Sequence, residues 1–227
     1  MLAFEVADPA ALLDRGVALL ESLADEPVPT LRWYRATRPA LVLGRGQRTL
    51  RTATGLPVVA RHSGGGAVLM DADLLCLDVL IPAGHPWLEG GPGAVFTPVG
   101  ASWAGALRAI GVRDLAVHRG PAAARRQGDA REQLLAAVCY ATLGRGEVTA
   151  GARKLVGLAQ RRRRQGALVQ CGLLRRWRPA RLLAALGADP DDAEVAASAV
   201  GLDDLVDPPP TDARIMDAVG SSLRAHG

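Results

Sequence analysis

Hydrophobic side chains recur along the chain with two different periods, which separate predicted helices from predicted strands. Residues 9–23 carry an apolar side chain at every third or fourth position behind Asp8-Pro9, a capping residue and a first-turn proline, and so predict an amphipathic surface helix. Helical spacing also marks residues 95–110, 182–186, 194–200 and 212–223. Alternating or continuous apolar runs predict strands at residues 31–36, 40–43, 73–82 and 112–119, of which 73–82 predicts a buried one.

The same alternation predicts a β-hairpin between residues 151 and 172. Gly157 and Ala159 fall on one face of its first strand, and Lys154 falls on the opposite face. A turn around Gln165 and Gly166 then returns the chain. Because a glycine inside a strand often marks the close approach of a ligand or another backbone, we expect such an approach at Gly157.

Lys154 is the only lysine in the chain, since the other 26 of its 27 basic side chains are arginine. A guanidinium stays charged and fork-shaped, whereas an ammonium is a compact charge with a tunable pKa. A composition that avoids lysine everywhere else therefore indicates that this position needs an amine. The alternative is that Lys154 is a lysine kept by chance on a solvent-exposed face. The strand-like pattern around Lys154 argues against this alternative.

A glycine-rich segment joins two further β-rich runs, in the order Arg61-His62-Ser63-Gly64-Gly65-Gly66. Three glycines remove every side chain from the reversal, so that backbone N–H groups can face a bound carbonyl, carboxylate or phosphate. Arg61 adds a positive charge beside them. A flexible hairpin tip is the alternative, but a third glycine directly before an apolar run favours binding. The spacing is of neither the Rossmann nor the Walker type.

Composition limits the class of protein. The chain has 227 residues, 49% of them hydrophobic, which is enough for a substantial core in one large domain or two small ones. No window approaches eighteen consecutive apolar residues, and the N-terminal segment is acidic where a signal peptide is basic. We therefore expect a soluble, cytoplasmic protein without a membrane partner.

Cysteine spacing and charge exclude further classes. Cys76, Cys139 and Cys171 are too widely spaced for a zinc site or a disulfide framework, so we expect free thiols and no metal site, with Cys76 in the core. The formal charge of +4 favours acidic partners. The four arginines at 161–164 have no aromatic residue between them, so we expect no nucleic-acid partner and prefer an acidic carrier protein.

Three motifs, in order and with their separations, resemble the lipoate-protein ligase and octanoyltransferase superfamily. They are Leu43-Gly44-Arg45-x-Gln47, Arg61-x-Ser63-Gly64-Gly65-Gly66-Ala67-Val68 and Arg153-Lys154-x-x-Gly157-x-Ala159-Gln160-x-Arg162. The resemblance covers about residues 10–190. It implies an α/β (α+β) fold of the biotin/lipoate-ligase type, with a bent mixed β-sheet and packed helices. It further implies one catalytic domain over residues 1–227, with a helical C-terminal part at 178–227.

The resemblance also implies an acyl-binding tunnel roofed by the glycine loop, with Lys154 at the acyl carbonyl or the acyl-adenylate. The substrate-binding residues that it implies are Arg45, Arg61, Ser63, Gly64, Gly65, Gly66, Ala67, Val68, Gly157 and Ala159.

Cys139 points to one branch of this superfamily. Cysteine-dependent octanoyltransferases have a Cys-Phe segment fifteen positions before their lysine, and Cys139-Tyr140 stands at that distance from Lys154. The resemblance implies that a Cys139 thiolate attacks a carrier-bound acyl thioester and that the amine of a target lysine resolves the acyl-enzyme. Lys154 would stabilise the thiolate and the developing oxyanion. From its position at the end of an apolar run alone, Cys139 would be a core residue.

Several departures keep alternatives open. Met70-Asp71 stands where many relatives have His-Asp, and Cys171-Gly172 where many have His-Gly, so Cys171 is a second candidate thiol. An ATP-dependent lipoate ligase that forms an acyl-adenylate is the second hypothesis, although the chain lacks the length for the accessory C-terminal domain of many ligases. Biotin ligation is the third, and a divergent, non-catalytic acyl-binding paralogue the fourth.

The leading hypothesis is transfer of an octanoyl or lipoyl group to a lysine of a lipoyl carrier domain. The expected donor is acyl carrier protein or another acyl carrier. The expected acceptors are lipoyl-domain proteins such as the glycine cleavage H protein or 2-oxoacid dehydrogenase subunits. A transferase of this type needs no cofactor, whereas a ligase would need ATP and Mg.

Overall fold

A computed structural model describes residues 1–227 except 48–52, 54, 122–128 and 227. Its main element is a seven-stranded sheet with the order β1-β2-β6-β10-β9-β8-β7. Only β1 and β2 are parallel, and the other neighbours in this sheet are antiparallel. The strands are β1 (Glu5–Ala7), β2 (Thr30–Ala36), β6 (Leu74–Pro82), β7 (Leu115–Val117), β8 (Val148–Ala150), β9 (Arg153–Arg163) and β10 (Gly166–Leu174).

A smaller sheet has the order β4-β3-β5, from β3 (Ala40–Leu43), β4 (Val58–Ala60) and β5 (Val68–Met70). β4 runs parallel to β3, and β5 runs antiparallel on its other side. The glycine-rich segment between β4 and β5 therefore does not close a hairpin of paired strands. It crosses the end of β3, where Leu43 pairs with Ala60 and Val42 pairs with Val68.

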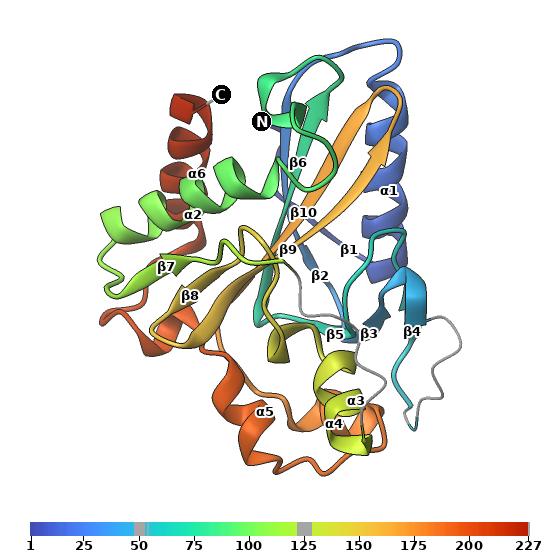
Figure 1. The fold of residues 1–227 in the computed structure, drawn as a ribbon, viewed down its shortest axis with the longest axis vertical. Coiled ribbons are helices and arrows are strands. Elements are labelled where there is room, and N and C mark those ends of the chain that lie inside the picture. The colour runs from blue at the N-terminus through green and yellow to red at the C-terminus, as the bar shows by residue number, and fades with distance from the viewer. Residues whose placement is uncertain (48–52, 54, 122–128, 227) are drawn as a thin grey trace.

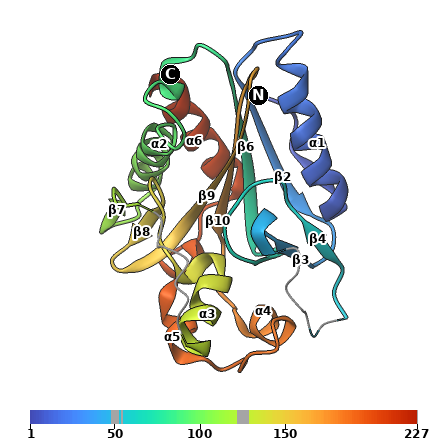
Figure 2. The same ribbon diagram turned by 45° about the vertical axis from the view of Figure 1, so that its right-hand side comes forward.

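Helices cover both faces of the large sheet, as Figures 1 and 2 show. Helix α1 (Pro9–Ser22) lies on one face, and its first turn is capped by the Asp8 carboxylate, which accepts from the Ala10 N–H. Helices α2 (Phe96–Ala109) and α6 (Asp212–His226) lie together on the other face. Because both faces are covered, every residue of β6 is buried.

The shorter helices gather at the end of the molecule that holds the small sheet (Figure 1). They are α3 (Ala130–Ala137), α4 (Ala180–Ala185) and α5 (Ala193–Ser198). Their apolar residues share a core with Leu41 and Leu43 of β3 and with Val138, which follows α3. This packing places the end of α3 beside the glycine-rich segment. No helix in the described ranges is long and apolar enough to cross a membrane.

The mixed α/β fold confirms the predicted class, and the main predicted elements are present. The helix at residues 9–23, the buried strand at 73–82 with Cys76 in the core, and the hairpin at 151–172 are confirmed. The strand at 112–119 is shorter than predicted, at Leu115–Val117. Strands β1 and β8 were not predicted, because three-residue segments carry too little alternation to be recognised.

Candidate active site

The glycine loop, residues 61–67, is fixed by Arg61 and by close contacts between backbones. The Arg61 side chain donates through Nε to Gly64 O at 3.0 Å and through Nη2 to Gly66 O at 3.0 Å. Gly65 has a positive φ of 98°, which favours glycine. A Cβ on Gly66 would lie 2.6 Å from the Cys139 backbone nitrogen, so the turn that carries Cys139 packs directly against the loop.

Cys139 lies in a 3₁₀ turn that follows α3 and is hydrogen-bonded to the glycine loop. The Cys139 N–H donates to Ala67 O at 2.9 Å, and the Ala67 N–H donates to Ala137 O at 2.6 Å. Cys139 is half-buried, whereas Cys76 and Cys171 are buried. Burial raises the pKa of the Cys76 thiol to about 12 and raises that of Cys171 further. Cys139 is therefore the accessible thiol, and Cys171 is a core residue.

Tyr140 occupies the space that two paired glycines leave on the sheet. Gly157 of β9 and Gly172 of β10 are direct cross-strand partners. The Tyr140 hydroxyl donates to Gly172 O at 2.7 Å. A Cβ would lie 2.8 Å from this hydroxyl at Gly172 and 3.3 Å from it at Gly157. The close approach predicted at Gly157 is thus made by Tyr140, which anchors the Cys139 turn to the sheet.

The Lys154 ammonium is surrounded by acceptors and is only 2% exposed as a residue. Nζ lies 2.8 Å from Cys139 O, 3.1 Å from Thr142 O and 2.7 Å from Glu147 Oε1, and it stands 5.1 Å above the centre of the Tyr140 ring. An ammonium has three donors that point in three directions. A planar guanidinium cannot reach the same three acceptors, which gives a structural reason for a single lysine at this position.

The prediction that Lys154 and Gly157 lie on opposite faces of the strand is wrong. The pairing of β8 with β9 shifts register between Val148, which pairs with Val156, and Thr149, which pairs with Lys154. This bulge interrupts the alternation, so that a Cβ on Gly157 would meet the Lys154 Cε at 3.3 Å. Lys154 therefore points to the same face as the Tyr140 ring.

Glu147 is a site residue that the sequence reasoning missed. Its buried carboxylate accepts from Lys154, from the Leu158 N–H at 3.1 Å and from the Gly144 N–H at 2.6 Å. A signal was present, because a buried lysine needs an anion and Glu147 is the only acidic residue between Glu132 and Asp189.

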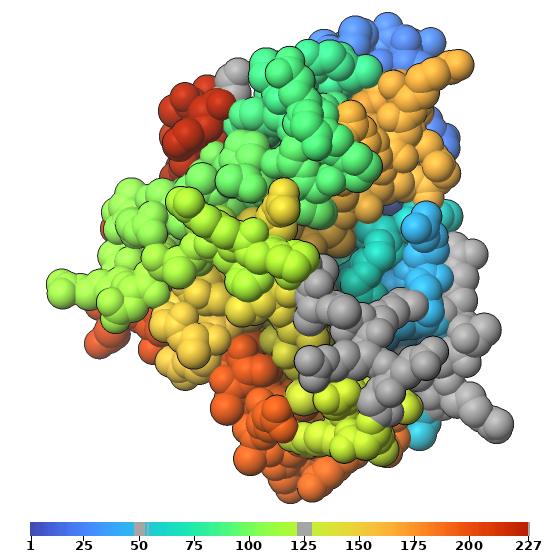
Figure 3. All heavy atoms as spheres, viewed as in Figure 1, coloured from blue at the N-terminus to red at the C-terminus, as the bar shows by residue number. Residues whose placement is uncertain are grey.

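Two cavities meet at Cys139. A narrow, mostly apolar pocket is lined by Cys139, Val68, Met70 and Leu74 among others, and extends to Tyr34. An open cleft of about 650 Å³ is lined by Cys139, Lys154, Gly64, Gly65 and Gly66 among others. Leu158 and Ala159 line both. The chain segments around the cleft, coloured teal, green and orange in Figure 3, meet near the centre of the face shown there. The thiol thus stands where an apolar chain and a polar head group would join.

The structure brings most of the predicted site residues together, with three exceptions. Arg61, Gly157 and Val68 line the apolar pocket along with Cys139. Arg45 is exposed, whereas Ser63 and Ala67 are buried, and none of the three lines the pocket or the cleft. They contribute contacts within and beside the glycine loop, since the Arg45 N–H donates to Ser63 O. No cluster of three possible metal ligands is found among the described residues.

A buried polar row, also missed from the sequence, runs under the apolar pocket. Asp78 of β6 accepts from Arg32 Nη1 at 2.8 Å and from the Tyr34 hydroxyl at 3.1 Å, and it is bonded to the Gln170 side chain. Gln170 Oε1 in turn accepts from Ser63 Oγ at 2.7 Å. Burial raises the pKa of Asp78 to about 6, although Arg32 and the hydrogen bonds oppose this shift. The row connects the sheet to the glycine loop.

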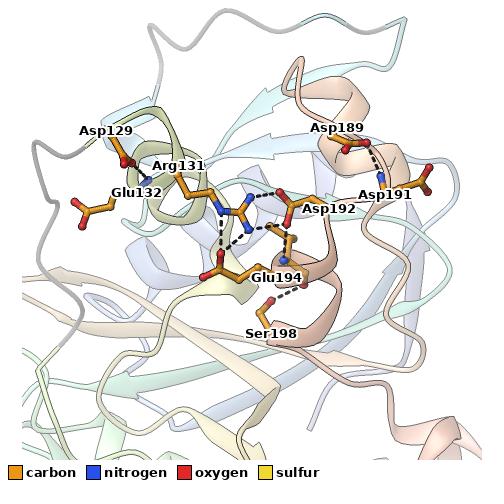
Figure 4. Close-up of polar contacts among 9 residues, drawn as sticks. Asp129, Arg131, Glu132, Asp189, Asp191, Asp192, Glu194 and Ser198 are labelled. Atoms are coloured by element: carbon orange, nitrogen blue, oxygen red, sulfur yellow. Dashed lines mark hydrogen bonds and ion pairs between the residues drawn. The ribbon is translucent and has the colours of Figure 1, made fainter.

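Figure 4 shows how α3 is held to the C-terminal helices. Arg131 of α3 makes ion pairs with Asp192 and Glu194 at the start of α5, and Asp129 caps α3 by accepting from the Glu132 N–H. The Arg131 hydrogen bond lowers the pKa of Asp192 to about 2. Since Cys139 follows α3 directly, this contact fixes the helix on which the Cys139 turn depends.

The chain matches the family of the lipoyl protein ligase A/B catalytic domain over residues 8–224 and belongs to this family. It is 34% identical to an octanoyltransferase LipM of Moorella thermoacetica, over 71% of this chain and 63% of that protein. An octanoyltransferase LipM of Carboxydothermus hydrogenoformans is 30% identical, over 64% of this chain and 52% of that protein. The chain thus spans between about half and two thirds of the length of these relatives.

Solved structures confirm the fold. A lipoate-protein ligase A bound with ATP has a TM-score of 0.70 and 17% identity, over 100% of this chain and 83% of that chain. P. falciparum LipL1 in complex with lipoate has a TM-score of 0.65 and 15% identity, over 99% of this chain and 62% of that chain. The superfamily predicted from the three motifs is therefore confirmed, and the similar curated proteins lie in its octanoyltransferase branch.

Proposed function

We propose that the protein transfers an octanoyl or lipoyl group from a carrier thioester to a lysine of a lipoyl domain, through an acyl-enzyme on Cys139. The observation that carries this proposal is the place of the accessible thiol. Cys139 lies at the junction of an apolar pocket and an open cleft, between the glycine loop and the turn held by Lys154. The similarity to octanoyltransferases supports the same reaction class.

The reaction would proceed in two displacements. In the first, the Cys139 thiolate attacks the carbonyl carbon of the donor thioester, and the carrier leaves as a thiolate. In the second, the neutral amine of the acceptor lysine attacks the same carbon, an amide forms and Cys139 leaves as a thiolate. The proton lost by the amine neutralises the carrier thiolate. One thioester and one amine become one amide and one thiol.

The glycine loop offers donors for the oxyanion of both steps. Among the described residues, no acceptor meets the backbone N–H groups of Gly64, Gly65 and Gly66, although these residues line the cleft beside Cys139. Free N–H groups fixed in this way can stabilise a developing oxyanion without reorganisation. The apolar pocket would hold the hydrocarbon chain of the acyl group.

The proposed partners follow from this chemistry. The donor would be an acyl carrier protein or a similar carrier, and the acceptor a lipoyl-domain protein such as the glycine cleavage H protein or a 2-oxoacid dehydrogenase subunit. The two displacements consume no ATP and no metal, so the transfer would need no cofactor. An ATP-dependent ligase would instead need ATP and Mg to form an acyl-adenylate.

Intact-protein mass spectrometry tests the proposal. After incubation with octanoyl-carrier protein, we expect a hydroxylamine-labile mass gain of one octanoyl group. The gain should be lost in Cys139→Ser and kept in Cys171→Ser, whose thiol is buried. A parallel sample contains lipoate, ATP and magnesium. A retained acyl-adenylate there, with no adduct on Cys139 in the first sample, would replace the transferase by a ligase. No acyl species in either sample would favour a non-catalytic paralogue.

A further inference from the structure

Two cations lie close to Cys139, and only one of them has an anionic partner among the described residues. Lys154 is paired with the Glu147 carboxylate at 2.7 Å. Arg61 is 8% exposed, and its guanidinium donates to two carbonyl oxygens, those of Gly64 and Gly66. Within the described part of the chain, no carboxylate lies within 4.0 Å of Arg61. A buried cation without a counterion is costly, so the surroundings of Arg61 favour the arrival of a negative charge.

The anion that can form beside Arg61 is the Cys139 thiolate. Arg61 Nη2 lies 3.9 Å from Cys139 Sγ, within hydrogen-bonding distance for sulfur. Gly65 makes this approach possible, because a Cβ there would lie 2.5 Å from Arg61 Nη2 and 4.0 Å from Cys139 Sγ. By contrast, the hydrogen bond from Lys154 Nζ to Cys139 is made to the carbonyl oxygen.

We propose that Arg61 is the counterion of the Cys139 thiolate, and that Lys154 is a positioning residue that holds the turn from Cys139 to Thr142. The proposal rests on the proposed function in treating Cys139 as the nucleophile. It assigns the two roles differently from the sequence alone, in which Lys154 stabilises the thiolate and Arg61 binds substrate. An arginine suits the role, since its fork of donors reaches two carbonyls and the sulfur together.

This assignment also gives Arg61 a role in both displacements. When the thiolate attacks the donor, its negative charge passes to the leaving carrier sulfur, and Arg61 again lacks a counterion. In the second displacement, the acceptor amine expels Cys139 as a thiolate, which Arg61 then stabilises as the leaving group. The same guanidinium therefore lies beside the sulfur both when it attacks and when it departs.

The test measures the thiolate without any transfer reaction. The full-length protein is alkylated with iodoacetamide at pH 7, and the modification of Cys139 is followed by peptide mass spectrometry. We expect Arg61→Gln to slow alkylation about tenfold, and Arg61→Lys to restore part of the rate, because only the thiolate reacts. At pH 9.5, where an unassisted thiol is largely ionised, the variants should converge. Arg153→Gln, which removes an exposed arginine beside Lys154, is the matched charge control.

The outcomes separate this proposal from the alternatives. An unchanged alkylation rate in folded Arg61→Gln would overturn it. If the same variant also lost affinity for free lipoate, Arg61 would be a carboxylate-binding group. A rate that is reduced equally at pH 7 and pH 9.5 would indicate altered access and would also count against it. Should Arg61→Gln not fold, Arg61→Ala with added guanidinium at pH 7 replaces it, and no recovery of the rate would be the contrary result.

The same experiment keeps two failures apart. Should octanoyl transfer fail in the wild-type protein while alkylation still depends on Arg61, the proposed function would be wrong and the counterion assignment right. If transfer occurs through Cys139 but the alkylation rate does not depend on Arg61, the proposed function would be right and the counterion assignment wrong. Cys76 and Cys171 do not confuse the measurement, because both are buried and burial raises the pKa of each.

Discussion

Two buried ion pairs lie on the same sheet, and they differ in what they hold. Lys154–Glu147 joins β9 to the turn before β8, and its ammonium also binds the carbonyls of the Cys139 turn. Arg32–Asp78 joins β2 to β6 and binds Leu12 O of α1. The first pair holds the Cys139 turn, whereas the second is connected to the glycine loop through Gln170 and Ser63.

The difference shows why burial alone does not mark a catalytic group. Both pairs are almost fully withdrawn from solvent, and the removal of one partner from either pair would destabilise the protein. Of the two pairs, only Lys154–Glu147 lines the cleft, and only Lys154 binds the backbone of Cys139. We therefore expect the loss of either pair to reduce stability, but only the loss of Lys154–Glu147 to abolish transfer without changing the apolar pocket.

The largest effect is expected from Lys154→Met. It leaves Glu147 buried without a counterion and should lower the free energy of unfolding by about 3–5 kcal/mol, as measured by urea denaturation. The double variant Lys154→Met/Glu147→Gln should recover much of that stability without recovering transfer. Lys154→Arg keeps the charge and should also fail in transfer, because its planar fork cannot reach the three acceptors. Full activity in Lys154→Arg would contradict the role given to the ammonium.

The second effect concerns Asp78 and depends on pH. The folded protein holds the pKa of this carboxyl at about 6, above its ordinary value of 3.8, so folding binds a proton between these values. The stability from this group is present below about pH 4 and is lost as pH rises through about 6, with a total near 3 kcal/mol. Urea denaturation from pH 4 to 7 should show this decline in the wild-type protein. The decline should be much smaller in Asp78→Asn, in which the raised pKa of the half-buried Asp71 carboxyl still contributes, and a parallel pH dependence in the two proteins would refute the assignment.

The periodicity of apolar residues predicted those helices and strands that a single segment of the sequence determines. The capped helix α1, the strand β6 and the hairpin of β9 and β10 each follow from a pattern within one segment. The family resemblance and the spacing of Cys139 from Lys154 also predicted that the glycine loop, Cys139 and Lys154 share a site, although about 70 to 90 residues separate the loop from the other two.

The remaining features depend on contacts between distant segments. The bulge that turns Lys154 toward Gly157 is imposed by pairing with β8, whose three residues show no alternation. The partner of Asp78 comes from β2, on a different part of the chain. Likewise, no pattern within residues 139–172 predicts that Tyr140 fills the space between Gly157 and Gly172. A charged residue inside an apolar run, as at Asp78, was the only local signal of the polar row.

The smallest effects are expected where Tyr140 packs on the sheet, and they separate packing from hydrogen bonding. Gly172→Ala places a Cβ 2.8 Å from the Tyr140 hydroxyl, so the ring must move, at a cost of about 1–3 kcal/mol in the free energy of unfolding. Tyr140→Phe removes the hydroxyl and its bond to Gly172 O, and should cost only about 1 kcal/mol. The double variant should be more stable than Gly172→Ala alone, because the shortened side chain no longer meets the added methyl group. Thermal and urea denaturation of the four proteins measure this coupling. A strictly additive loss would mean that Tyr140 does not occupy the space between the paired glycines, and the anchor proposed for the Cys139 turn would have to be sought in the contacts of Lys154 alone.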